Sequence, residues 1–76
     1  MVKVYSIPDC AACESVKSYL ASKGIVFESI DVRSDLEQRK EMMALTKAMS
    51  VPVTYLDGSF VIGFEKEQLN QLLKLK

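Results

Sequence analysis

The chain contains no histidine, and cysteine occurs only twice among its 76 residues. A structural zinc site or an iron–sulfur cluster takes four ligands, usually two cysteine pairs or one cysteine pair with histidines. One copy of the chain therefore cannot complete such a site from these residue types. Thiolates from a second copy or from an external thiol would be needed, so a metal or cluster carrier assembled by dimerisation remains an alternative.

An excess of charge is also absent, because ten basic and ten acidic side chains cancel. Such a chain has no long-range positive field to gather nucleic acid or an anionic membrane surface. No apolar run approaches the roughly 20 residues that cross a bilayer, and the N-terminus has neither the basic stretch nor the apolar segment of a secretion signal. We therefore expect a cytoplasmic protein with no nucleic-acid or membrane partner.

Glycine and proline are scarce, with three and two copies, whereas 49% of the residues are hydrophobic and 26% are charged. This balance is typical of a folded globular protein, and 76 residues leave room for one small core. We expect a single domain over residues 1–76 that folds alone as a monomer. Cytoplasmic thiols stay mostly reduced, so a close cysteine pair favours a catalytic or metal-binding role over a permanent bridge.

Changes in the spacing of apolar residues divide the chain into seven predicted elements. Alternating and β-branched apolar residues indicate strands, and helical spacing indicates helices. Pro52 ends the second helix, because proline cannot continue a helix, and Asp57-Gly58 predicts a tight hairpin turn. The predicted strands cover residues 2–6, 25–32, 53–56 and 59–63, and the predicted helices cover 11–22, a segment from Ser34 or Asp35 to about Met49, and 65–74.

The predicted order is βαβαββα, which belongs to the α/β fold class. The first strand–helix–strand unit requires a parallel pair, and the hairpin requires an antiparallel pair. A four-stranded mixed sheet flanked by three helices joins these elements through short, right-handed connections. The side chains expected to face the core include Leu36, Met43 and Leu45 in the second helix, Leu69, Leu72 and Leu73 in the last helix, and Met42 and Met49 as gap fillers.

Cys10 and Cys13 lie where the first predicted helix begins, in the stretch PDCAACE. Redox work on a disulfide needs one exposed thiolate as the nucleophile and a second thiol that breaks the resulting mixed disulfide. Unpaired N–H groups and the positive end of the helix dipole favour an anion at Cys10, and Cys13 follows one turn later on the same side. We predict that Cys10 attacks and that Cys13 resolves.

Neighbouring groups modify this prediction. The helix dipole contributes about 0.3 to 1 kcal/mol, so a strongly lowered pKa of Cys10 also requires N–H donors to the sulfur, from residues 12 and 13. The Asp9 carboxylate opposes the anion, but solvent screens that effect at an exposed turn, and a helix cap or solvated turn is its simpler role. An inert structural bridge is disfavoured, because closing so short a loop restrains the unfolded chain only slightly.

The chain resembles glutaredoxins and glutaredoxin-like proteins over two stretches, YSIPDCAACESVKSYLASKGIVFESIDV (residues 5–32) and SVPVTYLDGSFVIGFEKEQL (residues 50–69). The resemblance extends to the small members that serve as thioredoxin-reductase substrates and ribonucleotide reductase donors, and it covers almost the whole chain. The features that carry it are the CxxC after the first strand, Val51-Pro52 before the hairpin, and Gly63-Phe64-Glu65 before the last helix.

The resemblance implies a thioredoxin fold in which Val51-Pro52 is a cis peptide beside the cysteines and pairs with the substrate like an added strand. It also implies that Gly63, Phe64 and Glu65 bind substrate. The implied activity is that of a dithiol–disulfide oxidoreductase, which reduces protein or glutathione mixed disulfides without a bound cofactor. The implied partners are disulfide-containing proteins, with glutathione as a reducing co-substrate or thioredoxin reductase as the electron donor.

Several positions depart from the family pattern. Glutaredoxins commonly have Pro-Tyr between the cysteines, where this chain has Ala11-Ala12. A lysine that pairs with a glutathione carboxylate commonly precedes the first cysteine, where this chain has Ser6-Ile7-Pro8, and a Gly-Gly-acidic turn is reduced to Gly63-Phe64-Glu65. Lys66 is a candidate replacement cation, although a solvated helix charge is its simpler interpretation. A non-catalytic binding module that uses residues 51–64 remains a further alternative.

Overall fold

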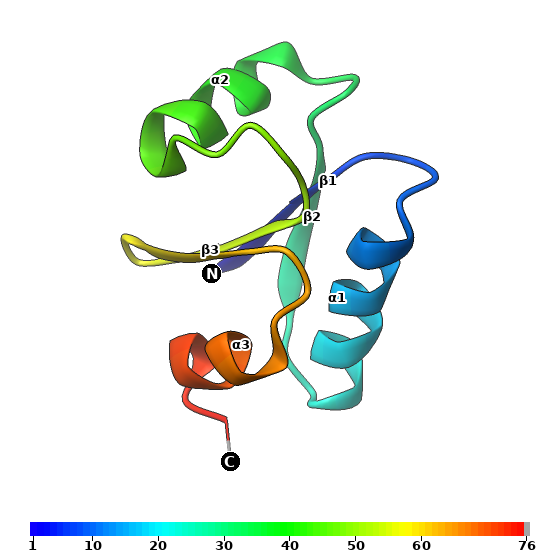
Figure 1. Cartoon of the computed structure of the whole chain (residues 1–76), viewed down its shortest axis with the longest axis vertical. Helices are drawn as coiled ribbons and strands as arrows, with labels where there is room; N and C mark the ends of the chain where they lie inside the picture. Colours follow the sequence, from blue (N-terminus) through cyan, green and yellow to red (C-terminus); the bar gives the residue numbers. More distant parts are fainter. Residues whose placement is uncertain (76) are drawn as a thin grey trace.

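The computed structural model describes residues 1–75, which form seven helices and strands. In chain order these are β1 (Val2–Ser6), α1 (Ala11–Ser22), β2 (Phe27–Asp31), α2 (Leu36–Thr46), β3 (Val53–Leu56), β4 (Ser59–Ile62) and α3 (Lys66–Leu73). This order confirms the predicted βαβαββα arrangement and the α/β fold class (Figure 1). Within residues 1–75, no helix has the length and apolar character required to cross a membrane.

The four strands form one mixed sheet in the order β2-β1-β3-β4. β1 and β2 are parallel, as the intervening α1 requires. β3 lies antiparallel to β1, with Thr54 opposite Val4, and β4 returns antiparallel along β3. Asp57 and Gly58 join β3 to β4 with positive φ angles of 49° and 87°, a turn conformation for which Asp-Gly is well suited.

Alternate residues of β1 point to opposite faces of the sheet, and each face has its own core. Figure 1 shows the corresponding layers, with α1 and α3 on one side of the sheet and α2 on the other. The core under α1 and α3 contains Val2, Val4, Val16, Leu20, Val61 and Leu69. The core under α2 contains Tyr5, Ile30, Val32, Met42, Ala48 and Val53.

The inward face of α2 differs from the prediction. Leu36, Met43 and Leu45 are 62%, 37% and 42% exposed, so the expectation that they face the core was wrong. The buried residues of this helix are Met42 and Thr46. Residues four apart lie on one face of a helix, and these two residues form the buried stripe of α2.

The end of α2 also differs from the prediction, because the helix stops at Thr46 and not near Met49. Lys47 adopts a left-handed conformation (φ 57°), which ends the helical path. The Thr46 hydroxyl donates to the Met42 carbonyl oxygen at 2.8 Å and accepts the Ala48 N–H at 3.1 Å. Met49 is 83% exposed, so the expectation that it fills a gap in the core was wrong.

Candidate redox site

Cys10 is the N-cap residue of α1. Its backbone is extended (φ −117°, ψ 107°), and its carbonyl oxygen accepts the Glu14 N–H at 3.1 Å. The Cys10 sulfur accepts the N–H of Cys13 at 3.2 Å. N-cap residues commonly accept such a bond through a side-chain oxygen, so here the sulfur itself satisfies a free N–H at the helix start. The structure thus contains the N–H donor that was predicted at residue 13.

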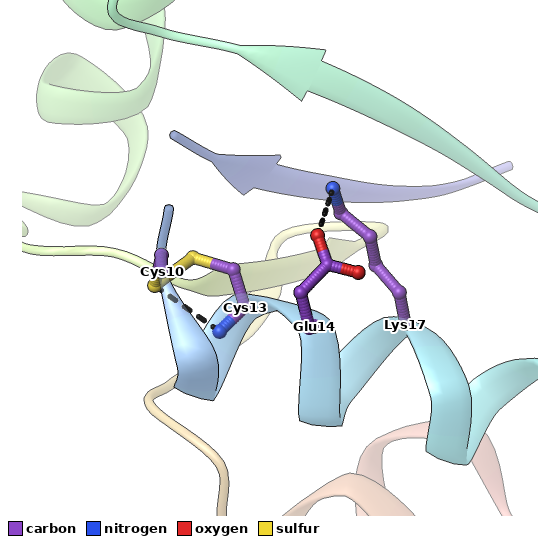
Figure 2. Close-up of polar contacts among 4 residues, drawn as sticks. All are labelled: Cys10, Cys13, Glu14 and Lys17. Carbon is purple, nitrogen blue, oxygen red and sulfur yellow. Dashed lines mark hydrogen bonds and ion pairs between the residues drawn. A yellow bond between two sulfur atoms is a disulfide. The ribbon is translucent and has the colours of Figure 1, made fainter. Parts of the chain in front are cut away.

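Cys10 and Cys13 form a disulfide, with their Cα atoms 5.2 Å apart (Figure 2). Access to the two residues is unequal, because Cys13 is fully buried at 0% exposure whereas Cys10 is partly exposed. An outside molecule therefore reaches the pair through Cys10, which is the arrangement that an attacking and a resolving cysteine require. Within residues 1–75, no group of three or more His, Cys, Asp or Glu side chains could hold a metal ion.

Two acidic residues flank the cysteine pair. Asp9 is exposed and has a φ of 57°, a conformation that aspartate tolerates better than most residues. Because Cys10 occupies the cap position, Asp9 serves as the turn residue and not as the cap. Glu14 pairs with the Lys17 ammonium at 3.7 Å (Figure 2), and this cation partly offsets the effect of the Glu14 carboxylate on an anion at Cys10.

The Val51–Pro52 peptide bond is cis, as the resemblance implied. Pro52 is buried, and its carbonyl oxygen accepts the N–H of Gly63 at 2.8 Å. Gly63 has a φ of 84°, a left-handed conformation that suits glycine. This hydrogen bond joins two parts of the predicted substrate-binding set. Among residues 1–75, no backbone hydrogen bond found outside the helices and strands uses Val51.

Phe64 turns toward α1, where its ring packs edge-on against Tyr19 at a centroid distance of 6.0 Å. The Lys66 ammonium lies 5.7 Å from the Tyr19 ring and 5.8 Å from the Phe64 ring, so it is more than a solvated charge. The Tyr19 hydroxyl also donates to the side-chain oxygen of Asn70, which ties α1 to α3. Glu65 is the exposed N-cap residue of α3 and makes no side-chain cap bond. Sequence reasoning missed the part that Tyr19 plays in this cluster.

Sequence reasoning also missed a cavity beside the segment that carries Cys10. Its volume is about 470 Å³, and its lining includes Ile7, Val51, Arg33 and Arg39. The last two are the only arginines in the sequence, on either side of the start of α2. The presence of both arginines near the start of α2 is the feature of the sequence that could have indicated this cavity. The sequence does not show that the chain after α2 brings Val51 beside them.

Known proteins share this fold and are similar to this chain in sequence. The family model described as Glutaredoxin matches residues 2–61. An uncharacterized glutaredoxin-like 8.6 kDa protein in the rubredoxin operon of Clostridium pasteurianum is 40% identical, over 97% of this chain and 99% of that protein. The crystal structure of the thioredoxin-like protein BC3987 is similar with a TM-score of 0.89 and 35% identity, over 95% of this chain and 99% of that one. The glutaredoxin-like protein NrdH-redoxin from Escherichia coli is similar with a TM-score of 0.83 and 25% identity, over 93% and 92% of the two chains.

Proposed function

Because this chain belongs to the glutaredoxin family, we propose that it is a dithiol–disulfide oxidoreductase that reduces protein disulfides or glutathione mixed disulfides. The family and the CxxC pair indicate thiol–disulfide redox activity. We assign Cys10 as the nucleophile and Cys13 as the resolving cysteine. The observation that carries this proposal is the disulfide at the start of α1, in which one cysteine is partly exposed and the other is enclosed.

The proposed reaction starts from the reduced protein. The Cys10 thiolate attacks one sulfur of the substrate disulfide, forms a mixed disulfide and releases the first substrate thiolate, which takes up a proton. Cys13 then loses its proton and attacks the Cys10 sulfur. This step releases the second substrate thiol and forms the Cys10–Cys13 disulfide seen in the structure. The two cysteines together supply two electrons; Cys13 supplies one proton, and the other, which Cys10 gave up when it ionised, is taken from solvent.

The start of α1 supports the first step by favouring the Cys10 anion. The Cys13 N–H already points at the Cys10 sulfur, and the unpaired N–H groups of the first helical turn add a positive potential. Resolution requires no large movement, because the Cα atoms of the two cysteines are 5.2 Å apart in the disulfide. The same helix start therefore serves both the attack and the resolution.

We place the substrate beside Val51 and Pro52. The Val51 backbone can pair with an extended polypeptide, as an added strand pairs with a sheet edge. Gly63 is hydrogen-bonded to Pro52, so Phe64 and Glu65 after it stand next to the same loop and complete the proposed substrate-binding set.

For the reducing partner we favour thioredoxin reductase over glutathione. Ala11-Ala12 and Ser6-Ile7-Pro8 stand where glutaredoxins commonly carry Pro-Tyr and a glutathione-binding lysine. The Escherichia coli NrdH-redoxin, a structural relative, is described as having a thioredoxin-like activity profile. We further propose that the protein acts in the cytoplasm as a monomer, on disulfide-containing proteins and without a bound cofactor.

The test uses the two single-cysteine variants and a disulfide-bonded protein such as insulin. Cys13→Ser is expected to accumulate a mixed disulfide through Cys10, and Cys10→Ser is expected to form none. Wild-type protein is then supplied either with NADPH and thioredoxin reductase or with glutathione, glutathione reductase and NADPH. Failure with both donors, together with no trapped product, would contradict the redox function. A coloured dimer that loses its colour when either cysteine is replaced would instead identify a cluster carrier.

A further inference from the structure

The cavity beside the cysteine-bearing segment has an apolar interior and a positively charged rim. Its volume is about 470 Å³. Val32 and Met42 are buried within its wall, and Val51 is half-buried at its border. Arg33 and Arg39 line it from exposed positions. The cavity therefore combines an apolar contact surface with two guanidinium groups, each of which is suited to bind a carboxylate in a bidentate manner.

Within residues 1–75, no ion pair neutralises the charge of this rim. The ion pairs among residues 1–75 are Lys3–Glu41 and Lys17–Glu14, and neither includes an arginine. The lining residues of the cavity include no acidic side chain. Although the chain as a whole has a net charge of zero, this cavity presents positive charge to its surroundings.

Four acidic residues lie within two positions of these arginines: Asp31, Asp35, Glu37 and Glu41. Glu41 pairs with Lys3, and Glu37 is exposed and is not among the residues that line the cavity. The Asp31 carboxylate accepts the backbone N–H of Arg33 at 2.9 Å, and the Asp35 carboxylate accepts the backbone N–H of Gln38 at 3.2 Å. Both carboxylates thus cap backbone donors around the start of α2. The guanidinium groups of Arg33 and Arg39 can therefore bind an external carboxylate.

The cavity lies within reach of the redox pair. Ile7, which lines it, precedes Cys10 by three residues, so their Cα atoms are at most about 11 Å apart. Val51 also lines it and precedes the cis Pro52. An extended polypeptide advances about 3.3 Å per residue, so a chain paired with Val51 and joined to Cys10 places a residue two or three positions from its cysteine in the cavity.

We propose that Arg33 and Arg39 select disulfide-bearing polypeptides that carry an acidic side chain within about three residues of the reactive cysteine. An apolar neighbour of that acidic residue packs against Met42 and Val51. Met49 extends this apolar surface outward, since it lines the cavity and is 83% exposed. A flexible methionine can pack against varied polypeptide side chains, whereas a small polar thiol would leave the Met49 side chain exposed to water. This inference rests on the proposed function and names the substrate class of that site.

The test measures single turnovers with short peptides that contain one cysteine activated as a 2-pyridyl disulfide. The Cys10 thiolate attacks the peptide sulfur and releases pyridine-2-thione, which is followed by absorbance, and Cys13 then releases the peptide thiol. The peptides carry glutamate, glutamine or lysine two residues before or after the cysteine, beside a leucine. Wild-type protein is expected to prefer the glutamate peptide over the glutamine peptide by about fivefold in one of the two placements, and high salt should reduce this preference.

The Arg33→Gln/Arg39→Gln double variant is expected to treat the glutamate and glutamine peptides alike. It should react with the uncharged probe 2,2′-dipyridyl disulfide at the wild-type rate, because Cys10 is unchanged. Lys40→Gln is the matched control, since it removes an exposed positive charge of α2 that does not line the cavity, and it should keep the preference.

The possible failures are distinguishable. If wild-type protein reduces all the peptides equally, or if the double variant keeps the preference, the inference about the cavity is wrong and the redox function stands. It is also wrong if the arginine replacements slow the reduction of the 2-pyridyl disulfide of glutathione by the same factor as the reduction of the glutamate peptide. If the reduced protein reacts with no peptide and not with the uncharged probe, the redox function itself is wrong.

Discussion

Thr46 holds the start of the segment that runs from α2 to Val51–Pro52, and replacing it with valine tests how that segment is fixed. Thr46 is 6% exposed, and its hydroxyl donates to the Met42 carbonyl oxygen at 2.8 Å and accepts the Ala48 N–H at 3.1 Å. Ala48 is itself 5% exposed, so its N–H has little access to water. Valine matches the shape of threonine but cannot accept this hydrogen bond.

The expected effect follows from the unsatisfied N–H. Leaving a buried donor without a partner costs about 1 to 3 kcal/mol. The added methyl group of valine offsets at most about 0.8 kcal/mol of this loss. We therefore expect Thr46→Val to lower the free energy of unfolding by about 1 kcal/mol, near the middle of the range of about 0.2 to 2.2 kcal/mol that remains after the full offset. In a domain of this size each 1 kcal/mol corresponds to a change in Tm of about 4 to 8 °C.

The assay is urea unfolding of the oxidised protein, followed by circular dichroism. Thr46→Ser is the control, because serine keeps the hydroxyl and loses one methyl group, worth about 0.8 kcal/mol. If the valine variant proves as stable as wild type, or clearly more stable than the serine variant, the Ala48 N–H does not depend on the Thr46 hydroxyl and the reasoning fails. A functional readout accompanies it, since a loosened segment should also slow the reduction of a peptide disulfide.

Three further substitutions test other parts of the fold. The Tyr5 hydroxyl is buried and has no hydrogen-bond partner among residues 1–75. Burial first, then the Glu41 carboxylate, raises the pKa of Tyr5 above 10.0. Because the pKa of Tyr5 is higher in the folded than in the unfolded protein, the contribution of its protonated form to stability is complete below pH about 10 and is lost as the pH rises through the folded pKa. Tyr5→Phe should therefore lose less stability than wild type when the pH is raised above about 10, as measured by urea unfolding. Asp35→Ala removes the side-chain acceptor of the Gln38 N–H and should lower the free energy of unfolding by about 1 kcal/mol; an unchanged urea midpoint would contradict the cap. Met42→Ala, at a site that is 2% exposed, should lower it by about 2 to 5 kcal/mol, and a thermal transition close to that of wild type would show that Met42 is not in a packed core.

The first helix and the hairpin were predictable because their signals are local. α1 covers Ala11–Ser22, as the change from alternating to helical spacing predicted. Asp57-Gly58 accepts two successive positive φ angles, and the strands on either side pair from Leu56↔Ser59 onward. The bounds of α1 and of the turn agree with the prediction, and β4 ends at Ile62, one residue before its predicted end.

The orientation of α2 was not predictable from α2 itself. Its sequence offers Leu36, Met43 and Leu45 as candidates for burial, and all of them are apolar. Met42, which was expected only to fill a gap, is the buried apolar residue of the helix and packs in one core with Tyr5. The sequence of a helix shows how much apolar surface it has, but the sheet decides which part is covered.

Two features of the site depend on residues that are distant in sequence. The cis state of Val51–Pro52 followed from the resemblance, since the dipeptide alone does not fix it. The cavity forms because the chain after α2 returns past Arg33 and Arg39 and brings Val51 beside Ile7. The spacing of residues along the sequence does not indicate that the chain folds back in this way. No role was therefore predicted for the two arginines.

The unequal access to the two cysteines has a consequence for the whole proposed cycle. Cys13 is fully buried, so neither a target disulfide nor a reducing partner can reach its sulfur directly. In the proposed cycle, Cys10 of the reduced protein attacks the target, and the donor then attacks the same Cys10 sulfur of the oxidised protein and releases the Cys13 thiolate. Both partners therefore occupy the surface around Cys10 and Val51, one after the other. A target peptide that fits this surface well must then compete with the donor, because the chain offers a single point of entry for both electron transfers.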